Sequence, residues 1–257
     1  MACVRFAYST TCGITMQLTK VIGHRGAAML APENTLASIK AAAEAGAKWV
    51  EIDVSLIADG GLIIFHDETL DRCTTGSGKL RLASPSLVAS LDAGRWFSSE
   101  YEGEKVPTLV QALDYIQSLG LGLNLEIKHD ADDVENIVPD VLEALKEHWQ
   151  DNEKLIISSF NHAALALCYQ MDSSRYLGQL YEDIPAEWQA QLAAIEAYSL
   201  HCDYERLTQA QATAIKQAGY KLLCYTVNEA QLVESHWRWG MDAVITDDPN
   251  LFVHLEK

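Results

Sequence analysis

The sequence predicts a (β/α)8 TIM barrel with a small insertion after the second strand. Short apolar runs alternate with amphipathic helical segments from residue 20 to residue 257, and eight such runs can be counted. The runs are apolar almost without interruption, which is typical of parallel strands whose outer face is covered by helices. Eight such units in a chain of this length favour a closed barrel over the alternative, an open doubly wound sheet.

The predicted strands are short segments rich in leucine, isoleucine, valine and tyrosine. Helical patterns or turn residues on either side set the ends of each segment. They span residues 20–24, 49–54, 121–128, 154–160, 176–181, 197–201, 221–227 and 242–247.

Helix start and stop signals fill the intervals between these strands. Asn34 is predicted to be the N-cap of a helix that ends at Gly46. Thr208 takes the same place before "QAQATAIKQAG", and "EAQLVESHWRWG" carries a further helical pattern before the last strand. These segments supply the helices that a parallel sheet needs on its outside.

One segment departs from this alternation. In "SLIADGGLIIFHD" the "ADGG" predicts a hairpin turn, and residues 68–106 that follow are too long for a plain loop between strand and helix. We expect residues 68–106 to form an insertion over one end of the barrel, within a single domain spanning residues 20–257. Residues 1–19 show no clear hydrophobic region of signal-peptide length, and we expect a disordered N-terminal extension there.

The charge of the chain limits its partners. Lysine and arginine number 19 against 36 acidic residues, a net charge of -17, so nucleic acid is not expected to bind. No apolar run approaches the roughly 20 residues that span a bilayer, and no stable membrane association is expected. The six cysteines form no CxxC pair, which favours a reducing, cytoplasmic location. The oligomeric state is left open.

Three carboxylates are predicted to meet at the mouth of the barrel, where enzymes of this fold place their sites. Glu51 and Asp53 lie two residues apart on the second strand and so share a face, and Glu126 lies on the third. They would repel one another unless a cation lay among them. Oxygen ligands suit Mg²⁺ or Ca²⁺ better than zinc. For any single carboxylate, a salt bridge to Lys128 or Arg25 is the alternative.

Two histidines and two cations lie at the same strand ends. His24 and Arg25 end the first strand, His66 ends the extended arm after the second, and Lys128 ends the third. Paired imidazoles can exchange protons near neutral pH, and the two cations suit a phosphoryl group. A hydrogen-bonded turn residue is the alternative for a lone histidine beside glycines. Together with a metal, the set favours phosphoryl transfer in a small anionic diester.

Longer motifs add a family resemblance. "GHRGAAMLAPENTLASIKAA", "WVEIDVSLIADGGLIIFHDETLDRCTTGSG", "VPTLVQAL", "NLEIK", "CYTVN" and "VITDDP" occur in this order. In these motifs the chain resembles the soluble, bacterial-type glycerophosphodiester phosphodiesterases. The resemblance implies a (β/α)8 barrel that hydrolyses glycerophosphodiesters, such as glycerophosphocholine or glycerophosphoethanolamine, to sn-glycerol 3-phosphate and the free alcohol.

The resemblance also implies roles for residues of this chain. The three carboxylates would hold the metal, the two histidines would be the acid–base pair, and Arg25 and Lys128 would hold the phosphate. Glu33, in "PENT", would lie beside the site in a supporting role. Family enzymes are thought to let the glycerol 2-hydroxyl attack phosphorus to give a cyclic phosphate, which water then opens. Direct attack by water and the order in which the histidines act stay open.

Two other functions remain as alternatives. A phospholipase D-like enzyme acting on lysophospholipids would need an apolar or basic docking surface, and this acidic chain gives little sign of either. A barrel that only binds glycerophosphodiesters could lose a histidine or a metal-binding carboxylate without penalty. This chain keeps both histidines and all three carboxylates, which favours catalysis over binding alone.

Overall fold

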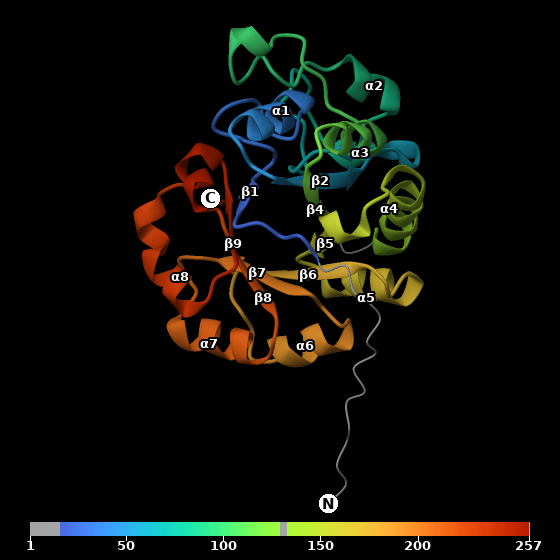
Figure 1. Ribbon diagram of the computed structural model, residues 1–257. Coiled ribbons are helices and arrows are strands. Elements are labelled where there is room, and N and C mark those ends of the chain that lie inside the picture. Colours follow the sequence, from blue (N-terminus) through green and yellow to red (C-terminus); the bar gives the residue numbers. More distant parts are fainter. Residues whose placement is uncertain (1–15, 129–132, 257) are drawn as a thin grey trace, which may run out of the picture.

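The strands of the computed structural model, which describes residues 16–128 and 133–256, close into a ring surrounded by helices (Figure 1). The strands are β1 (Val21–Gly23), β2 (Trp49–Leu56), β3 (Leu62–Ile64), β4 (Gly122–Ile127), β5 (Leu155–Ser159), β6 (Tyr176–Tyr181), β7 (Ser199–Asp203), β8 (Lys221–Tyr225) and β9 (Ala243–Thr246). Residues 1–15 of the expected N-terminal extension lie outside the described residues.

The sheet order confirms the predicted barrel. Among the described residues, nine strands form one sheet in the order β1-β9-β8-β7-β6-β5-β4-β2-β3, and a further pairing of β1 with β2 closes it. Only β3 pairs antiparallel, as the second half of a hairpin with β2. The other eight strands are parallel, so the ring is a closed (β/α)8 barrel.

The helices that cover the outside of this ring are seen in Figure 1. They are α1 (Leu36–Glu44), α3 (Leu109–Ser118), α4 (Val134–His148), α5 (His162–Met171), α6 (Trp188–Ala194), α7 (Gln209–Gln217) and α8 (Glu234–Trp239). A further helix, α2 (Pro85–Ser90), belongs to the segment between β3 and α3. Within the described part of the chain, no helix has both the length and the apolar character needed to cross a membrane.

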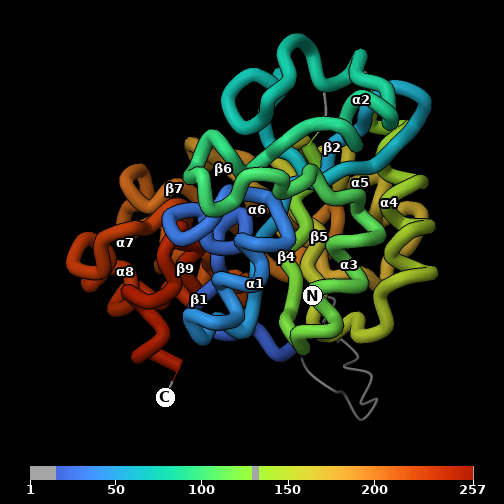
Figure 2. Tube along the Cα trace, turned by 90° about the horizontal axis from the view of Figure 1, so that it is seen from above, coloured from blue at the N-terminus to red at the C-terminus, as the bar shows by residue number. Residues whose placement is uncertain are grey.

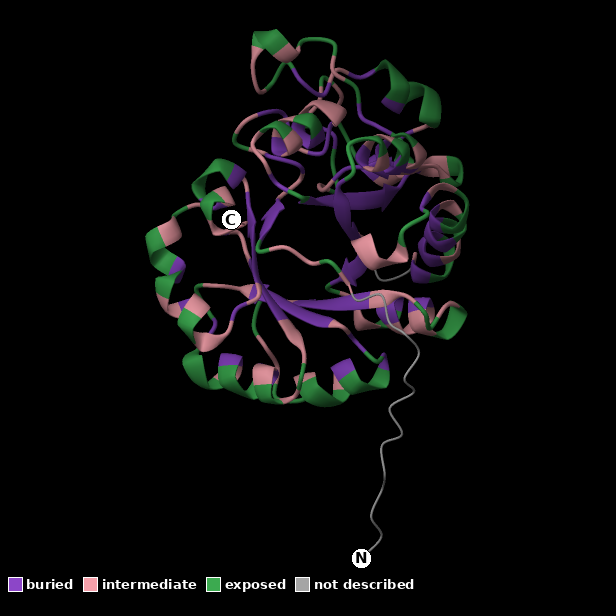
Figure 3. Cartoon of the chain, in the orientation of Figure 1, coloured by how far each residue is buried: buried purple, intermediate pink, exposed green. Residues whose placement is uncertain are grey.

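The core follows from the alternation of side chains along the strands. On β2, Val50, Ile52 and Val54 point outward and pack with buried residues of the surrounding helices. Figure 3 shows the strands buried along most of their length and the helices exposed on their outer faces. The intervening Glu51 and Asp53 therefore face the interior of the barrel, and their register pairs Glu51 with Asn124 and Asp53 with Glu126.

The start of α1 differs from the prediction. Thr35 is the N-cap, and its hydroxyl accepts a hydrogen bond from the Ser38 backbone N–H. Asn34 was the predicted cap, but its φ of 55° lies in the left-handed region, whereas an N-cap is normally extended. The prediction for Thr208 is confirmed: it caps α7 and forms a capping box with Gln211.

The segment between β3 and α3 has a small core of its own. After the hairpin turn, where Asp59 and Gly60 have positive φ, the chain runs through α2 and back to the barrel. Buried residues of this segment, among them Leu70, Cys73 and Val88, form a separate hydrophobic cluster. The segment, coloured teal to green in Figure 2, rises above one end of the ring over β2. It thus lies beside the barrel mouth to which β3 leads.

Candidate active site

A cavity of about 180 Å³ opens at the C-terminal ends of the strands. Every residue predicted from the sequence for the site lines this cavity except Glu33, which lies beside it. Residues from β4 to β9 complete the lining, among them Asn124, Phe160, Leu180 and Tyr225. The strand ends therefore bring together side chains that are up to about a hundred residues apart within the predicted set, as the barrel requires.

The three carboxylates lie inside the mouth as one cluster. One oxygen from each of Glu51, Asp53 and Glu126 lies within 4.8 Å of the others, and all three residues are buried. Burial, followed by the charge of Asp53, raises the pKa of Glu51 well above its usual value and that of Glu126 to about 7. Glu51 Oε1 is buried and has no hydrogen-bond partner among the described residues. Such a donor set fits a hard divalent cation.

Asp53 is held in its charged form by its neighbours. Burial alone would raise its pKa, but the charges of Arg25, Lys128 and His66 lower it below the usual value. Asn34 also contributes, because its Nδ2 donates to Asp53 Oδ2 at 2.8 Å and its Oδ1 accepts from the Asp53 N–H at 3.2 Å. Asn34 was predicted to cap a helix, whereas its side chain holds an acidic residue of the cluster in place.

Each predicted histidine is held at Nδ1 by an aspartate. His24 Nδ1 lies 2.6 Å from Asp247 Oδ1, and His66 Nδ1 lies 2.8 Å from Asp67 Oδ1. A carboxylate at Nδ1 favours the tautomer with the proton there, which leaves Nε2 to exchange a proton with a bound molecule. His24 Nε2 lies 3.9 Å from Glu51 Oε2, next to the acidic cluster. Burial lowers the pKa of His66, against the charge of Asp53, which raises it.

The aspartate behind His24 is fixed by a residue from another motif. Asn228 Nδ2 donates to Asp247 Oδ2 at 2.6 Å, and Asn228 Oδ1 accepts from the Asp247 N–H at 2.9 Å. Burial would raise the pKa of Asp247, but the hydrogen bonds from His24 and Asn228 lower it. Sequence reasoning used "TVN" and "TDDP" only for the resemblance. These motifs contain Asn228 and Asp247, and they were the signal that could have placed both residues at the site.

The two cations are anchored on the carboxylates. Arg25, at a positive φ of 49°, donates its backbone N–H to Glu51 Oε2 at 3.0 Å and its Nη1 to Glu33 Oε1 at 2.6 Å. Lys128 Nζ lies 2.8 Å from Glu126 Oε1 and 3.8 Å from Asp53 Oδ1. These acidic partners raise the pKa of Lys128 above its usual value, although burial would lower it. Both side chains are therefore positively charged beside the cavity.

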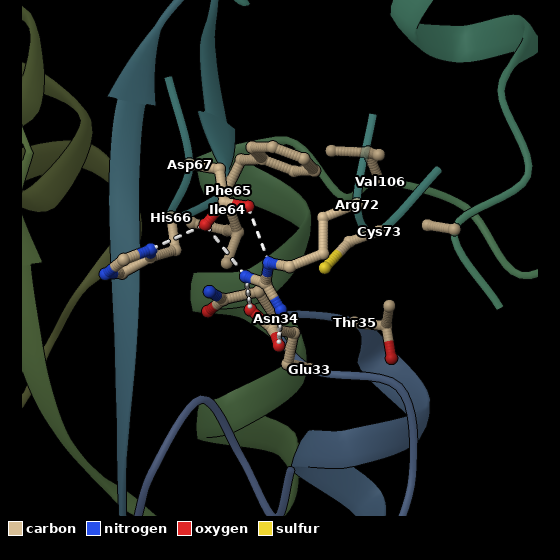
Figure 4. Close-up of a pocket in the computed structure, with 11 residues that line it drawn as sticks. Glu33, Asn34, Thr35, Ile64, Phe65, His66, Asp67, Arg72, Cys73 and Val106 are labelled. Atoms are coloured by element: carbon tan, nitrogen blue, oxygen red, sulfur yellow. Dashed lines mark hydrogen bonds and ion pairs between the residues drawn. The ribbon is translucent and has the colours of Figure 1, made fainter. Parts of the chain in front are cut away.

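Glu33 and Asp67 are joined by an arginine that the sequence did not single out. Arg72 Nη1 donates to Glu33 Oε2 at 2.7 Å, and Arg72 Nε donates to Asp67 Oδ2 at 2.6 Å. Figure 4 shows the guanidinium lying between the two carboxylates, with His66 bound to Asp67 on the far side. Arg72 thus connects the segment after β3, which carries His66 and Asp67, to the segment between β1 and α1, which carries Glu33.

The model of the glycerophosphoryl diester phosphodiesterase family matches residues 24–251. The chain belongs to this family. A glycerophosphodiester phosphodiesterase of Caldanaerobacter subterraneus subsp. tengcongensis is 37% identical over 240 residues, covering 93% of this chain and 98% of its own. One from Bacillus subtilis is 31% identical over 254 residues, covering 92% and 86%.

Solved structures of the phosphodiesterase family agree with this membership. A phosphodiesterase of Oleispira antarctica, in complex with the product sn-glycerol-3-phosphate, superposes with a TM-score of 0.90 at 38% identity, covering 93% of this chain and 98% of its own. The enzyme from Thermotoga maritima gives 0.75 at 28% identity, covering 93% and 99%. The chain is therefore a phosphodiesterase, and not a barrel that only binds.

This phosphodiesterase has an aromatic wall on the β5 and β8 side of its cavity. The rings of Phe160 and Tyr225 meet edge to face with centroids 5.9 Å apart, and Lys128 Nζ lies 5.8 Å from the Phe160 centroid. The Tyr225 hydroxyl donates to the Tyr181 carbonyl at 2.8 Å, which fixes the ring. Phe160 is 46% exposed, so its face can contact a molecule entering the cavity.

Proposed function

We propose that the chain hydrolyses small glycerophosphodiesters, such as glycerophosphocholine or glycerophosphoethanolamine, to sn-glycerol 3-phosphate and the free alcohol. The observation that carries this proposal is the pair of histidines, each held at Nδ1 by an aspartate, in one cavity with the acidic cluster and two cations. The relative from Oleispira antarctica is described with the product sn-glycerol-3-phosphate, which supports the same product here.

In this proposal the cations and histidines divide the work. Arg25 and Lys128 bind the phosphoryl oxygens, Arg25 by its planar fork and Lys128 as a point charge. One histidine removes the proton from the attacking hydroxyl through Nε2, and the other gives a proton to the leaving alcohol oxygen. We propose the glycerol 2-hydroxyl as the nucleophile, because an internal group gains from proximity. The cyclic phosphate formed is then opened by water with the proton transfers reversed.

Glu51, Asp53 and Glu126 would hold the divalent cation, Mg²⁺ or Ca²⁺. When bound, the cation would polarise the phosphoryl oxygens and offset the mutual repulsion of the carboxylates. Four buried free cysteines among the described residues, Cys73, Cys168, Cys202 and Cys224, support the reducing, cytoplasmic location in which we expect the enzyme to act.

The deciding experiment follows sn-glycerol 3-phosphate release from glycerophosphocholine with a coupled dehydrogenase, using metal-stripped protein with EDTA, Mg²⁺ or Ca²⁺ in parallel. We expect no release in EDTA and restored turnover with one of the two cations. Lysophosphatidylcholine serves as a second substrate, with choline release measured for both substrates, because its cleavage gives lysophosphatidic acid and choline. Faster turnover of lysophosphatidylcholine would favour the phospholipase D-like alternative. An analogue that lacks the 2-hydroxyl tests the nucleophile, since its cleavage at the normal rate would require direct attack by water.

The metal assignment has its own variant. Glu51→Gln removes one charged ligand and should weaken the affinity for the activating metal by about tenfold or more. A titration of activity or of thermal shift measures this affinity. Glu44→Gln is the matched control, because Glu44 lies on α1 in an exposed pair with Lys40. An identical titration for Glu51→Gln and the unaltered protein would remove Glu51 from the ligand set.

A further inference from the structure

Arg72 uses four of its five N–H donors on two carboxylates. Toward Asp67, Nε donates to Oδ2 at 2.6 Å and Nη2 to Oδ1 at 2.8 Å. Toward Glu33, Nη1 donates to Oε2 at 2.7 Å and Nη2 to Oε1 at 2.8 Å. Both contacts are bidentate, the geometry that gives a guanidinium its strongest and most directional pairing with a carboxylate.

Each of these carboxylates also holds a residue of the proposed reaction. Glu33 Oε1 accepts from Arg25 Nη1 at 2.6 Å, and Asp67 Oδ1 binds His66 Nδ1 at 2.8 Å. Through Glu33, Arg72 is therefore linked to Arg25, the proposed phosphate-binding residue. Through Asp67 it is linked to His66, a proposed proton carrier. Figure 4 shows the chain from His66 through Asp67 and Arg72 to Glu33 in one view.

The small core of the segment between β3 and α3 fixes the backbone on both sides of Arg72. Leu70 and Cys73 are buried in that cluster, and the Leu70 N–H donates to the Gly78 carbonyl at 3.0 Å. Arg72 itself is 46% exposed on its side chain, whereas Glu33 is only 10% exposed. The guanidinium therefore reaches inward from a turn that is anchored by buried residues, and it keeps one side open to solvent.

Without Arg72, the two carboxylates would face each other with no cation between them. The two negative charges would repel each other. Each carboxylate could then move apart only by displacing the group that it holds, Arg25 for Glu33 and His66 for Asp67. A lysine in this place would keep the charge, but a single ammonium cannot make two bidentate contacts. The link thus depends on the planar shape of arginine as well as on its charge.

We infer that Arg72 is a positioning residue that sets Arg25 and His66 relative to each other through Glu33 and Asp67. The inference rests on the proposed function for its kinetic consequence. It gives the segment between β3 and α3 a direct part in the site, in addition to covering one end of the barrel.

The kinetic test compares Arg72→Ala and Arg72→Lys on glycerophosphocholine at saturating metal. We expect kcat to fall by about 10–100-fold in both variants, the range found for residues that orient an active group through another. Arg95→Ala is the matched control, because Arg95 lies in the same segment in an exposed pair with Glu102 and should keep kcat and KM. Values for Arg72→Ala within twofold of the unaltered protein would overturn the inference.

Guanidinium ions give a readout that a merely structural role would not move. About 20 mM guanidinium chloride, far below the molar range that unfolds proteins, should restore part of the kcat of Arg72→Ala by entering the solvent-open gap. Arg72→Lys and Arg95→Ala should show no gain, and NaCl should not substitute for guanidinium. Loss of kcat without this rescue, accompanied by a lower Tm, would assign Arg72 to stability alone.

Histidine NMR separates this inference from the proposed function. In spectra of ¹⁵N-histidine-labelled protein, the ring signals of His66, assigned with His66→Gln, should shift in Arg72→Ala and stay in place in Arg95→Ala. If the unaltered protein turned over no glycerophosphodiester, the proposed function would fail while a shifted His66 signal still supported the positioning role. Unshifted His66 signals in Arg72→Ala would overturn the positioning role whatever the activity.

Discussion

The two halves of the barrel contribute to the cavity in different ways. Every proposed proton carrier, phosphate-binding cation and metal ligand comes from residues 24–128, either on β2 and β4 or directly after β1, β3 and β4. The second half supplies Phe160, Leu180 and Tyr225 as walls, and Asp247 as the support of His24. The proposed catalytic and ligand-binding groups thus lie on one side of the ring. The other side forms the walls of the cavity and holds His24 in place.

This division makes the expected sizes of mutational effects differ between the halves. In the proposed function, groups in the first half act on the reacting atoms, so their loss should lower kcat. Groups in the second half would contact the alcohol portion or hold another side chain, so their loss should have smaller or more selective effects. Variants in both halves therefore test whether the two sides of the ring differ in this way.

The largest effect is expected for the two histidines. His24→Ala or His66→Ala should lower kcat by about 10²–10⁴-fold, because each removes a proton carrier, while the Tm stays close to that of the unaltered protein. Steady-state assays with glycerophosphocholine measure the change. His148→Ala is the control, since His148 pairs with Asp114 away from the cavity. Near-normal kcat in either variant would remove that histidine from the acid–base pair.

Asp247→Asn tests how far the second half shares in the chemistry. The amide can donate to His24 Nδ1 and so stabilise the wrong tautomer, and we expect kcat to fall by about 10–100-fold with little change in KM. The neighbouring Asp248→Asn is the control, because Asp248 accepts from the Asn250 N–H at 3.0 Å and does not line the cavity. A fall in kcat as large as that of His24→Ala would contradict the division, because a group of the second half would then matter as much as a proton carrier of the first.

Phe160→Ala should have a smaller and substrate-selective effect. A quaternary ammonium over an aromatic face gains about 0.5–1 kcal/mol at an exposed site, so KM for glycerophosphocholine should rise about 2–5-fold. A substrate with an uncharged alcohol portion, glycerophosphoglycerol, provides the comparison and should change less. Equal changes for both substrates would mean that Phe160 contributes shape alone.

His201, inside the barrel on β7, should affect stability and not turnover. Burial lowers its pKa from 6.5 to about 3, so the folded protein keeps it neutral while the unfolded chain binds a proton below pH 6.5. The free energy of unfolding should therefore fall as pH drops, by about 2 kcal/mol between pH 7 and 5 from this residue. Urea unfolding at both pH values measures this, and the pH dependence should be weaker in His201→Gln. A parallel dependence in both proteins would contradict the assignment.

The fold could be predicted because hydrophobic periodicity is local. Strand and helix patterns repeat along the chain, and the ring brings the strand ends together, so Glu51 and Glu126 meet as expected. The role of Asn34 depends on its contact with Asp53, and that of Arg72 depends on joining the nearby Asp67 to the distant Glu33, for which no local pattern exists. Asn34 shows the limit clearly, because the residue types that cap helices also bind carboxylates.

The contact between His24 and Asp247 joins the first and last strands across 223 residues of sequence. β1 pairs with β9 on one side and β2 on the other, so this contact forms only when the ring closes. Long-range contacts of this kind form late in folding, because loop closure must precede them. Recovery of activity during refolding should therefore report on docking of the last strand, and a nascent chain that has not yet emerged to residue 247 should be inert.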